Sequence, residues 1–347
     1  MASENNPTSI SRSGRLLINC AAFVVVTAGI RAANSLFVPF LLSLFIAIIC
    51  LSPYLWLQKR KVPTGVALLL VILGILAIGS TIGTVVGASV NSFANNLPRY
   101  SAILREKTLL ITELMANAGF KLPSVPLTET LGLDEPLQLI GGFLGALGKV
   151  LSNTVLIILT VVFILLEASS FPAKLRVAFQ SPETSLNNFD KVHENIKRYM
   201  ALKTLVSLGT GFFVAIWLLI LGIDYPLLWG LMAFLLNYIP NIGSIIAAVP
   251  AVLLGLIQYG FGSALLVTGG YLVVNFVFGN MLEPRLMGRG LGLSTLVVFL
   301  SLVFWGWVLG PVGMLLSVPL TMTAKIALDS NEDTRWLAIM LGSSKQP

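Results

Sequence analysis

Charged side chains are scarce in this chain. Of 347 residues, 22 are lysine or arginine and 15 are aspartate or glutamate, so that charged residues make up only 11%, compared with roughly 25% in soluble domains. Hydrophobic residues reach 56%, and the mean hydropathy is +0.90. This composition excludes a water-soluble enzyme and is typical of a polytopic membrane protein.

Histidine and cysteine are almost absent. The single histidine, His193, lies in a hydrophilic stretch, so that neither a two-histidine metal site nor a Ser-His-Asp triad within the membrane can be built. Cys20 and Cys50 lie in apolar runs without metal-type spacing. The chain also lacks a Gly-x-x-x-x-Gly-Lys-Ser/Thr loop for ATP. We therefore expect no enzyme activity, no metal site and no cofactor.

The formal net charge of +7 indicates membrane topology rather than nucleic-acid binding. If the N-terminus is cytosolic, sixteen lysine and arginine residues fall on the inner face, which is the side that basic residues favour. The polar first residues lack an apolar core with a cleavage site and indicate a cytosolic tail, not a signal peptide. Both termini are then cytosolic. The outer face keeps six basic residues: Arg31, Arg99, Arg105, Lys107, Lys121 and Lys149.

Apolar runs follow one another along the chain, and most are long enough to cross a membrane once, since about 20 helical residues span the hydrocarbon core. Two runs, 227–257 and 291–327, are too long for one span and are interrupted near their middles by proline and glycine. Each is either a pair of full spans or a re-entrant hairpin, and hydropathy does not separate these readings. We favour hairpins and predict an all-α protein with about six full spans plus two re-entrant helical hairpins. The single runs are 16–30, 36–51, 64–90, 150–166, 204–221 and 263–282.

The interruption of the first long run combines Pro240, a candidate hinge residue, with Gly243, so helical hydrogen bonding must break there. Peptide groups freed at membrane depth are tolerated only inside protein or against a water-filled cavity, where they can bind a polar solute or an ion. A tight surface turn between two spans is the alternative reading. The candidate substrate-binding residues here are Asn237, Tyr238, Asn241, Gly243 and Ser244.

Charged residues and glycines gather at the inner end of the next span. Glu283 is close in sequence to Arg285 and Arg289, and ionisable groups at this depth are expected to pair or to extend to water. These three residues are candidates for an inner gate, and the alternative is cytosolic anchoring. Asn275 and Asn280 are further candidates for substrate binding, and Gly288 and Gly290 for a hinge.

The second long run breaks at Gly310 and Pro311, which we interpret as a hinge or the tip of a hairpin. Ser317 and Thr321 follow and supply small hydroxyl groups, although hydroxyls in helices also bond to their own backbone. Under the predicted topology the two hairpins open from opposite faces of the membrane. Opposed hairpins of this kind resemble the core of secondary transporters that work by alternating access.

By these patterns the chain divides into six parts. They are a cytosolic tail (1–15), N-terminal transmembrane helices (16–90), extramembrane amphipathic helices (91–149), a transmembrane helix with a charged connector (150–203), a transport core with two helical hairpins (204–328) and a cytosolic tail (329–347).

Three stretches resemble the hallmarks of the autoinducer-2 exporter family: NYIPNIGS at 237–244, EPRLMG at 283–288 and GPVGMLLSVPL at 310–320. The likeness covers nearly the whole chain. It implies a permease of the bacterial inner membrane that exports autoinducer-2, a small hydroxylated quorum-sensing signal, forms homo-oligomers such as pentamers, and moves like an elevator.

Other members of that family resemble sodium/proton antiporters, so membership alone does not fix the substrate. A cation site needs a membrane-embedded carboxylate, and Asp224 and Glu283 are the candidates near the core. Both lie at the ends of apolar runs, which favours a neutral solute. The alternatives are therefore an antiporter that uses Asp224 or Glu283, and a membrane scaffold without transport.

Overall fold

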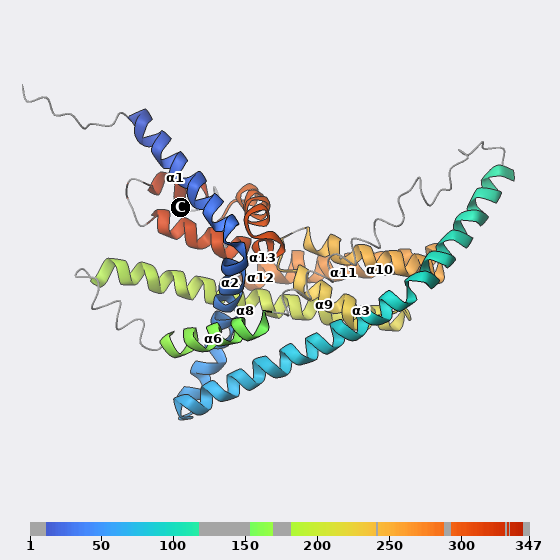
Figure 1. The fold of residues 1–347 in the computed structure, drawn as a ribbon, viewed down its shortest axis with the longest axis horizontal. Helices are drawn as coiled ribbons and strands as arrows, with labels where there is room; N and C mark the ends of the chain where they lie inside the picture. Colours follow the sequence, from blue (N-terminus) through green and yellow to red (C-terminus); the bar gives the residue numbers. More distant parts are fainter. Residues whose placement is uncertain are drawn as a thin grey trace, which may run out of the picture.

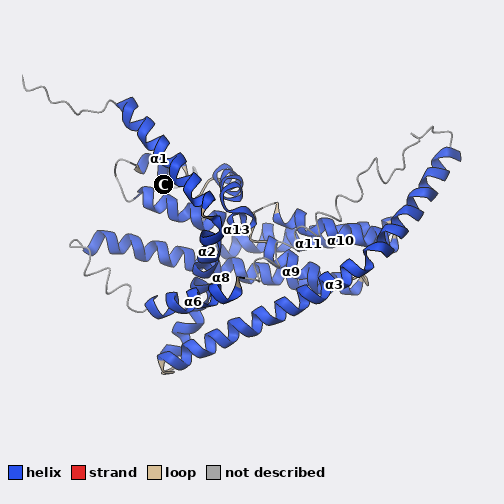
Figure 2. Cartoon of the chain, viewed as in Figure 1, coloured by secondary structure: helices blue, strands red, loops and turns tan. Residues whose placement is uncertain are grey.

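The computed structural model describes residues 12–117, 153–168, 182–240, 242–287, 293–329, 332 and 334–342. Within these residues every regular element is a helix, as predicted (Figure 2). The elements are α1 (Arg12–Ala32), α2 (Asn34–Lys59), α3 (Thr64–Asn117), α6 (Thr154–Ala168), α8 (Pro182–Ile220), α9 (Pro226–Leu236), α10 (Gly243–Tyr259), α11 (Phe261–Asn275), the π-helix η1 (Phe276–Leu282), α12 (Glu283–Met287), α13 (Thr295–Asp329) and α14 (Arg335–Met340).

Large apolar side chains cover much of the surface. Val155 is 80% exposed, Phe261 72% and Leu36 70%, an arrangement that is stable where hydrocarbon is the solvent. Among the described residues, five helices are long and apolar enough to cross a membrane. These findings confirm the prediction of a polytopic helical membrane protein. The five stretches are Asn34–Lys59, Thr64–Asn96, Ile196–Ile220, Phe261–Leu286 and Thr295–Asp329.

The first two predicted spans are joined by a bend. Helical hydrogen bonds run across the junction, from Ala33 N to Gly29 O and from Phe37 N to Ala33 O, and α1 leads into α2 with only a change of direction (Figure 1). The apolar part of α1, Cys20–Ala32, is also shorter than a full span. The sequence reading, which placed Arg31 in a loop between two spans, therefore differs from the structure at this point.

The helix α3 is much longer than the apolar run within it. It continues as one helix to Asn117 and extends past α9 and α10 (Figure 1), where the sequence reading expected separate short helices from residue 91. Pro98 lies inside this helix but does not end it, although a proline removes one backbone hydrogen bond. The remainder of that predicted segment, 118–149, lies outside the described residues.

The helix α8 is central to the second half of the chain. Helices α9, α11 and α13 all pack against it, and α10 packs against α9 and α11. A core of buried apolar side chains, including Leu218, Trp229, Ala251 and Val267, joins α8 to α9, α10 and α11. A separate core, with Tyr54, Ala67 and Val161 among its members, joins α2, α3 and α6.

Candidate functional site

The first predicted break is present and turns the chain back. Helix α9 ends at Leu236 and tightens, with Tyr238 N bonded to Leu235 O and Ile239 N to Leu236 O, before α10 begins at Gly243. The two helices pack against each other and form a helical hairpin. A β-carbon at Gly243 would lie 1.8 Å from Leu236 O, so only glycine allows this close approach.

Two neutral hydrogen bonds tie the break to α8. The amide nitrogen of Asn237 donates to Ser207 Oγ over 2.9 Å, and the hydroxyl of Tyr238 donates to Thr204 Oγ1 over 2.7 Å. Asn237 is 8% exposed, Tyr238 6% and Ser207 0%. Two of the predicted substrate-binding residues therefore lie together in the interior, where a buried polar group needs a partner.

One of these partners, Ser207, belongs to a polar face of α8 that consists of Tyr199, Lys203, Ser207 and Thr210, all buried, and Thr204, which is partly exposed, borders this face. The intervals of four, four and three residues place the four side chains on one side of the helix. Sequence reasoning missed this face, because it assigned the residues up to 203 to a cytosolic connector. The signal that could have found it is this spacing of polar residues leading into an apolar run.

Lys203 forms a buried ion pair with Glu283. The lysine Nζ donates to the two carboxylate oxygens over 2.7 and 2.8 Å, and the side chains are only 5% and 20% exposed. From the sequence, we expected Glu283 either to pair, with Arg285 and Arg289 close by, or to extend to water. It pairs across to α8, and the side chain of Arg285 is exposed.

The second predicted break is a reversal at Gly310. Its φ of 68° and ψ of −152° lie in a region open essentially to glycine alone. The two halves of α13 then lie against each other, since Ser301 Oγ donates to Ser317 O over 2.9 Å and Trp305 Nε1 donates to Thr321 Oγ1 over 3.0 Å. Ser301 and Thr321 are also hydrogen-bonded to each other.

Ser317 and Thr321 therefore lie inside the second hairpin and are bonded within it. The Oγ of Ser317 donates to Met314 O over 2.8 Å. The hairpin contacts α8 through Val318 and Met322, which pack with Tyr199 at one end of the α8 polar face. Both broken segments thus meet α8.

The predicted coupling residue Asp224 lies at the other end of α8, in the turn to α9. Its carboxylate accepts a hydrogen bond of 2.8 Å from Tyr100 of α3, while Asn96 donates to Tyr225 over 2.8 Å. Burial, followed by the hydrogen bonds to Tyr225 and Asp224, raises the pKa of Tyr100 above its ordinary value. This cluster fastens α3 to the α8–α9 turn.

The remaining candidates are not gathered at the α8 polar face. Asn280 is exposed on η1, and Asn275 and Ser244 are partly exposed. Pro240 is half-buried beside the break, and Pro311 is exposed at the tip of the second hairpin. Asn241, Gly288, Arg289 and Gly290 lie outside the described residues.

Two helical hairpins that enclose buried polar side chains lie within a helical bundle, an arrangement that resembles the broken helices of membrane transporters. Residues 20–332 match the family described as AI-2E family transporter, and the chain belongs to this family. It is 39% identical to the AI-2 transport protein TqsA of Escherichia coli K12, over 94% of this chain and 95% of that protein.

Other relatives are similar over the same length. The chain is 38% identical to the putative transport protein YhhT of Escherichia coli K12, over 95% of each chain. It is 39% identical to a putative transport protein of Haemophilus influenzae, over 94% of this chain and 96% of that protein. The family is one of transporters.

Proposed function

We propose that this protein exports autoinducer-2, a small neutral hydroxylated signal, across the bacterial inner membrane by alternating access. One relative is named an AI-2 transport protein, and it is similar over nearly its whole length. We also propose cytosolic termini, from the bias of basic residues, and a homo-oligomer such as a pentamer, from the family resemblance.

The observation that carries the proposal is the contact between the first break and the α8 polar face. Asn237 and Tyr238 meet Ser207 and Thr204 through neutral hydrogen bonds. Amide and hydroxyl groups both donate and accept, so a polyhydroxylated solute can replace each of these bonds. A site that bonds substrate hydroxyls also rejects analogues that lack them.

In this mechanism, the first hairpin separates from α8 to admit the solute and closes once the solute is released. Asn237 and Tyr238 then exchange their bonds with α8 for bonds with the solute. Both described candidate carboxylates are engaged, Glu283 with Lys203 and Asp224 with Tyr100. This favours a neutral solute over a cation, and it gives Glu283 the role of a gate, with Arg285 and Arg289 beside it in sequence.

Uptake of autoinducer-2 into inverted membrane vesicles tests the proposal. Asn237→Ala and Ser207→Ala should each lower the initial rate about tenfold, since loss of one hydrogen bond that leaves a buried partner costs about 1–3 kcal/mol. Thr268→Ala is the matched control, because within the described residues the Thr268 hydroxyl bonds only to Ala264 O of its own helix. Wild-type rates in both test variants would refute the proposed site.

A second candidate function is exchange of a cation for protons at Glu283. The observation behind it is the position of Glu283, which is only 20% exposed and lies in a helical stretch long and apolar enough to cross a membrane, because ionisable groups inside a membrane commonly serve ion or proton pathways. It predicts gradient-coupled sodium flux in proteoliposomes that Glu283→Gln abolishes. If the wild-type protein carries no sodium flux in proteoliposomes, cation exchange is excluded.

A further inference from the structure

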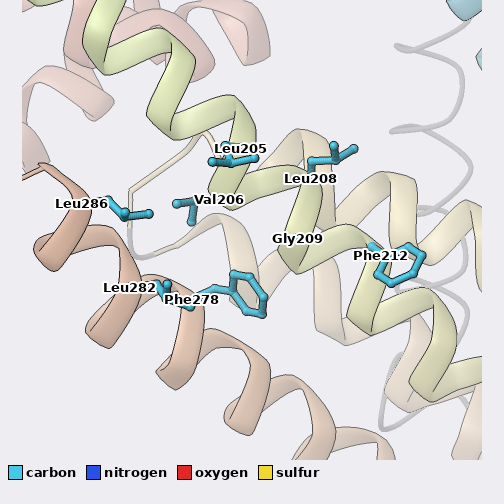
Figure 3. Close-up of a pocket in the computed structure, with 8 residues that line it drawn as sticks. All are labelled: Leu205, Val206, Leu208, Gly209, Phe212, Phe278, Leu282 and Leu286. Atoms are coloured by element: carbon cyan, nitrogen blue, oxygen red, sulfur yellow. The ribbon is translucent and has the colours of Figure 1, made fainter.

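A groove lies on the surface of the helical bundle, between α8 and the η1–α12 segment (Figure 3). Its volume is about 460 Å³. Its floor is narrow, since a β-carbon at Gly209 would lie 2.4 Å from the ring of Phe278. The two helices that form it are long and apolar enough to cross the membrane, which places the groove at the depth of the bilayer. Its walls include Leu205, Leu208 and Phe212 from α8, and Phe278, Leu282 and Leu286 from η1 and α12.

The two walls of the groove, α8 and the segment formed by α11, η1 and α12, run antiparallel. Their direction determines which residues lie at each end of the groove. Lys203 pairs with Glu283, and further along α8 the indole of Trp217 donates to Leu266 O. The beginning of the membrane-spanning part of α8 therefore lies beside the end of α12. Arg198 and Arg285 are at this shared end, and both are exposed.

The groove thus combines an apolar channel with two exposed cations at this end. Arg198 precedes Phe212 by fourteen residues, or about 21 Å of helix at 1.5 Å per residue. That length equals half of a bilayer of about 40–45 Å including its headgroups. A phosphate level with Arg198 would place the end of an acyl chain near Phe212.

We infer that this groove binds a phospholipid with an anionic headgroup, its phosphate at Arg198 and Arg285 and one acyl chain between α8 and η1. Basic residues between transmembrane helices bind such headgroups, at about 1 kcal/mol for each arginine. The lipid bridges the two helices that carry Lys203 and Glu283. Lipid binding at this groove does not depend on which solute is transported. A failure of this inference would therefore leave the proposed export of autoinducer-2 untouched, and the reverse also holds.

Native mass spectrometry of the purified protein, titrated with phosphatidylglycerol or with phosphatidylcholine of the same acyl chains, tests the inference. The wild-type protein should retain phosphatidylglycerol in preference. Arg198→Gln with Arg285→Gln should weaken that retention about thirtyfold and leave phosphatidylcholine binding unchanged. Lys59→Gln with Arg60→Gln removes two exposed charges from the end of α2 and should retain the preference.

A second variant tests the channel without touching the arginines. Leu205→Trp fills the groove, and it should lower retention of phosphatidylglycerol at least fivefold. Equal retention of the two lipids by the wild-type protein, or undiminished phosphatidylglycerol binding in the arginine variant, would overturn the inference. So would crosslinking of Leu208→Cys to a second copy, in a chain with Cys20 and Cys50 replaced by serine, because the groove would then be a subunit interface.

Discussion

Lys203 of α8 donates to both carboxylate oxygens of Glu283 at the start of α12, over 2.7 and 2.8 Å. The two residues are 80 positions apart in the sequence. The pair joins the central helix, whose polar face meets both helical hairpins, to the segment formed by α11, η1 and α12. Because the pair is buried, removing one charge leaves the other in the interior without a counter-ion.

Removing one partner of this pair should destabilise the protein, and the two single changes should differ. Glu283→Gln leaves a lysine that is 5% exposed without its counter-ion, and we expect a loss of about 3 kcal/mol or more. Lys203→Met leaves a carboxylate that is 20% exposed, and the loss should be smaller. Thermal unfolding in detergent measures both.

The double change Lys203→Met with Glu283→Gln should recover at least half of the Glu283→Gln loss, because no unpaired charge then remains in the pair. Arg335→Gln is the control, since its pair with Asp329 spans 3.6 Å and is mostly exposed and should contribute little. Additive losses in the double variant would contradict the account.

The hydrogen bond from Tyr100 to Asp224 predicts a dependence on alkaline pH. The pKa of Tyr100 is raised above its ordinary value of about 10 by burial first and then by its hydrogen bonds. The folded protein therefore keeps a proton that the unfolded chain loses. The stability contributed by Tyr100 is complete below about pH 10 and falls as the pH rises further.

Tyr100→Phe should remove this alkaline dependence and cost about 1 kcal/mol near neutral pH, the value of one hydrogen bond. The measurement is the unfolding temperature of wild type and variant at pH 8 and at pH 10.5. The two curves should converge as the pH rises. Parallel curves would show that the phenol does not titrate with folding.

Gly243 should not tolerate a side chain. In Gly243→Ala the new β-carbon would approach the carbonyl oxygen of Leu236 to 1.8 Å, and the backbone of the hairpin would have to move. We expect a loss of at least 2 kcal/mol, as for other severe overpacking, together with loss of transport. Gly262→Ala is the matched control, because a β-carbon there meets nothing within 4 Å. Equal unfolding temperatures for the two variants would refute the close approach.

Local chemistry explains which features were predictable from the sequence. Proline and glycine occur together at 240–243 and at 310–311, where each weakens helical hydrogen bonding, and both reversals lie at these positions. A single proline such as Pro98 did not end its helix. The helical class follows equally directly from the lengths of the apolar runs.

The pairings between helices were not predictable in this way. Glu283 has two arginines within six residues, and a single sequence contains nothing that favours Lys203, 80 residues away, over them. The continuation of α3 past residue 91 was missed for a related reason. The apolar run of α3 ends there. Beyond it the helix is held by contacts with another segment, in which the ring of Phe93 packs against Trp229 and the hydroxyl of Tyr100 bonds to that of Tyr225.

In the proposed mechanism, the break after α9 and the α8 polar face bind the transported solute. The most direct test is the unfolding temperature of the purified protein with and without autoinducer-2. At about 100 times its dissociation constant, a ligand of the folded state stabilises by about 2.7 kcal/mol. We predict this stabilisation for the wild-type protein and for Thr268→Ala, and its loss in Asn237→Ala. Equal stabilisation of Asn237→Ala and the wild-type protein would contradict the account.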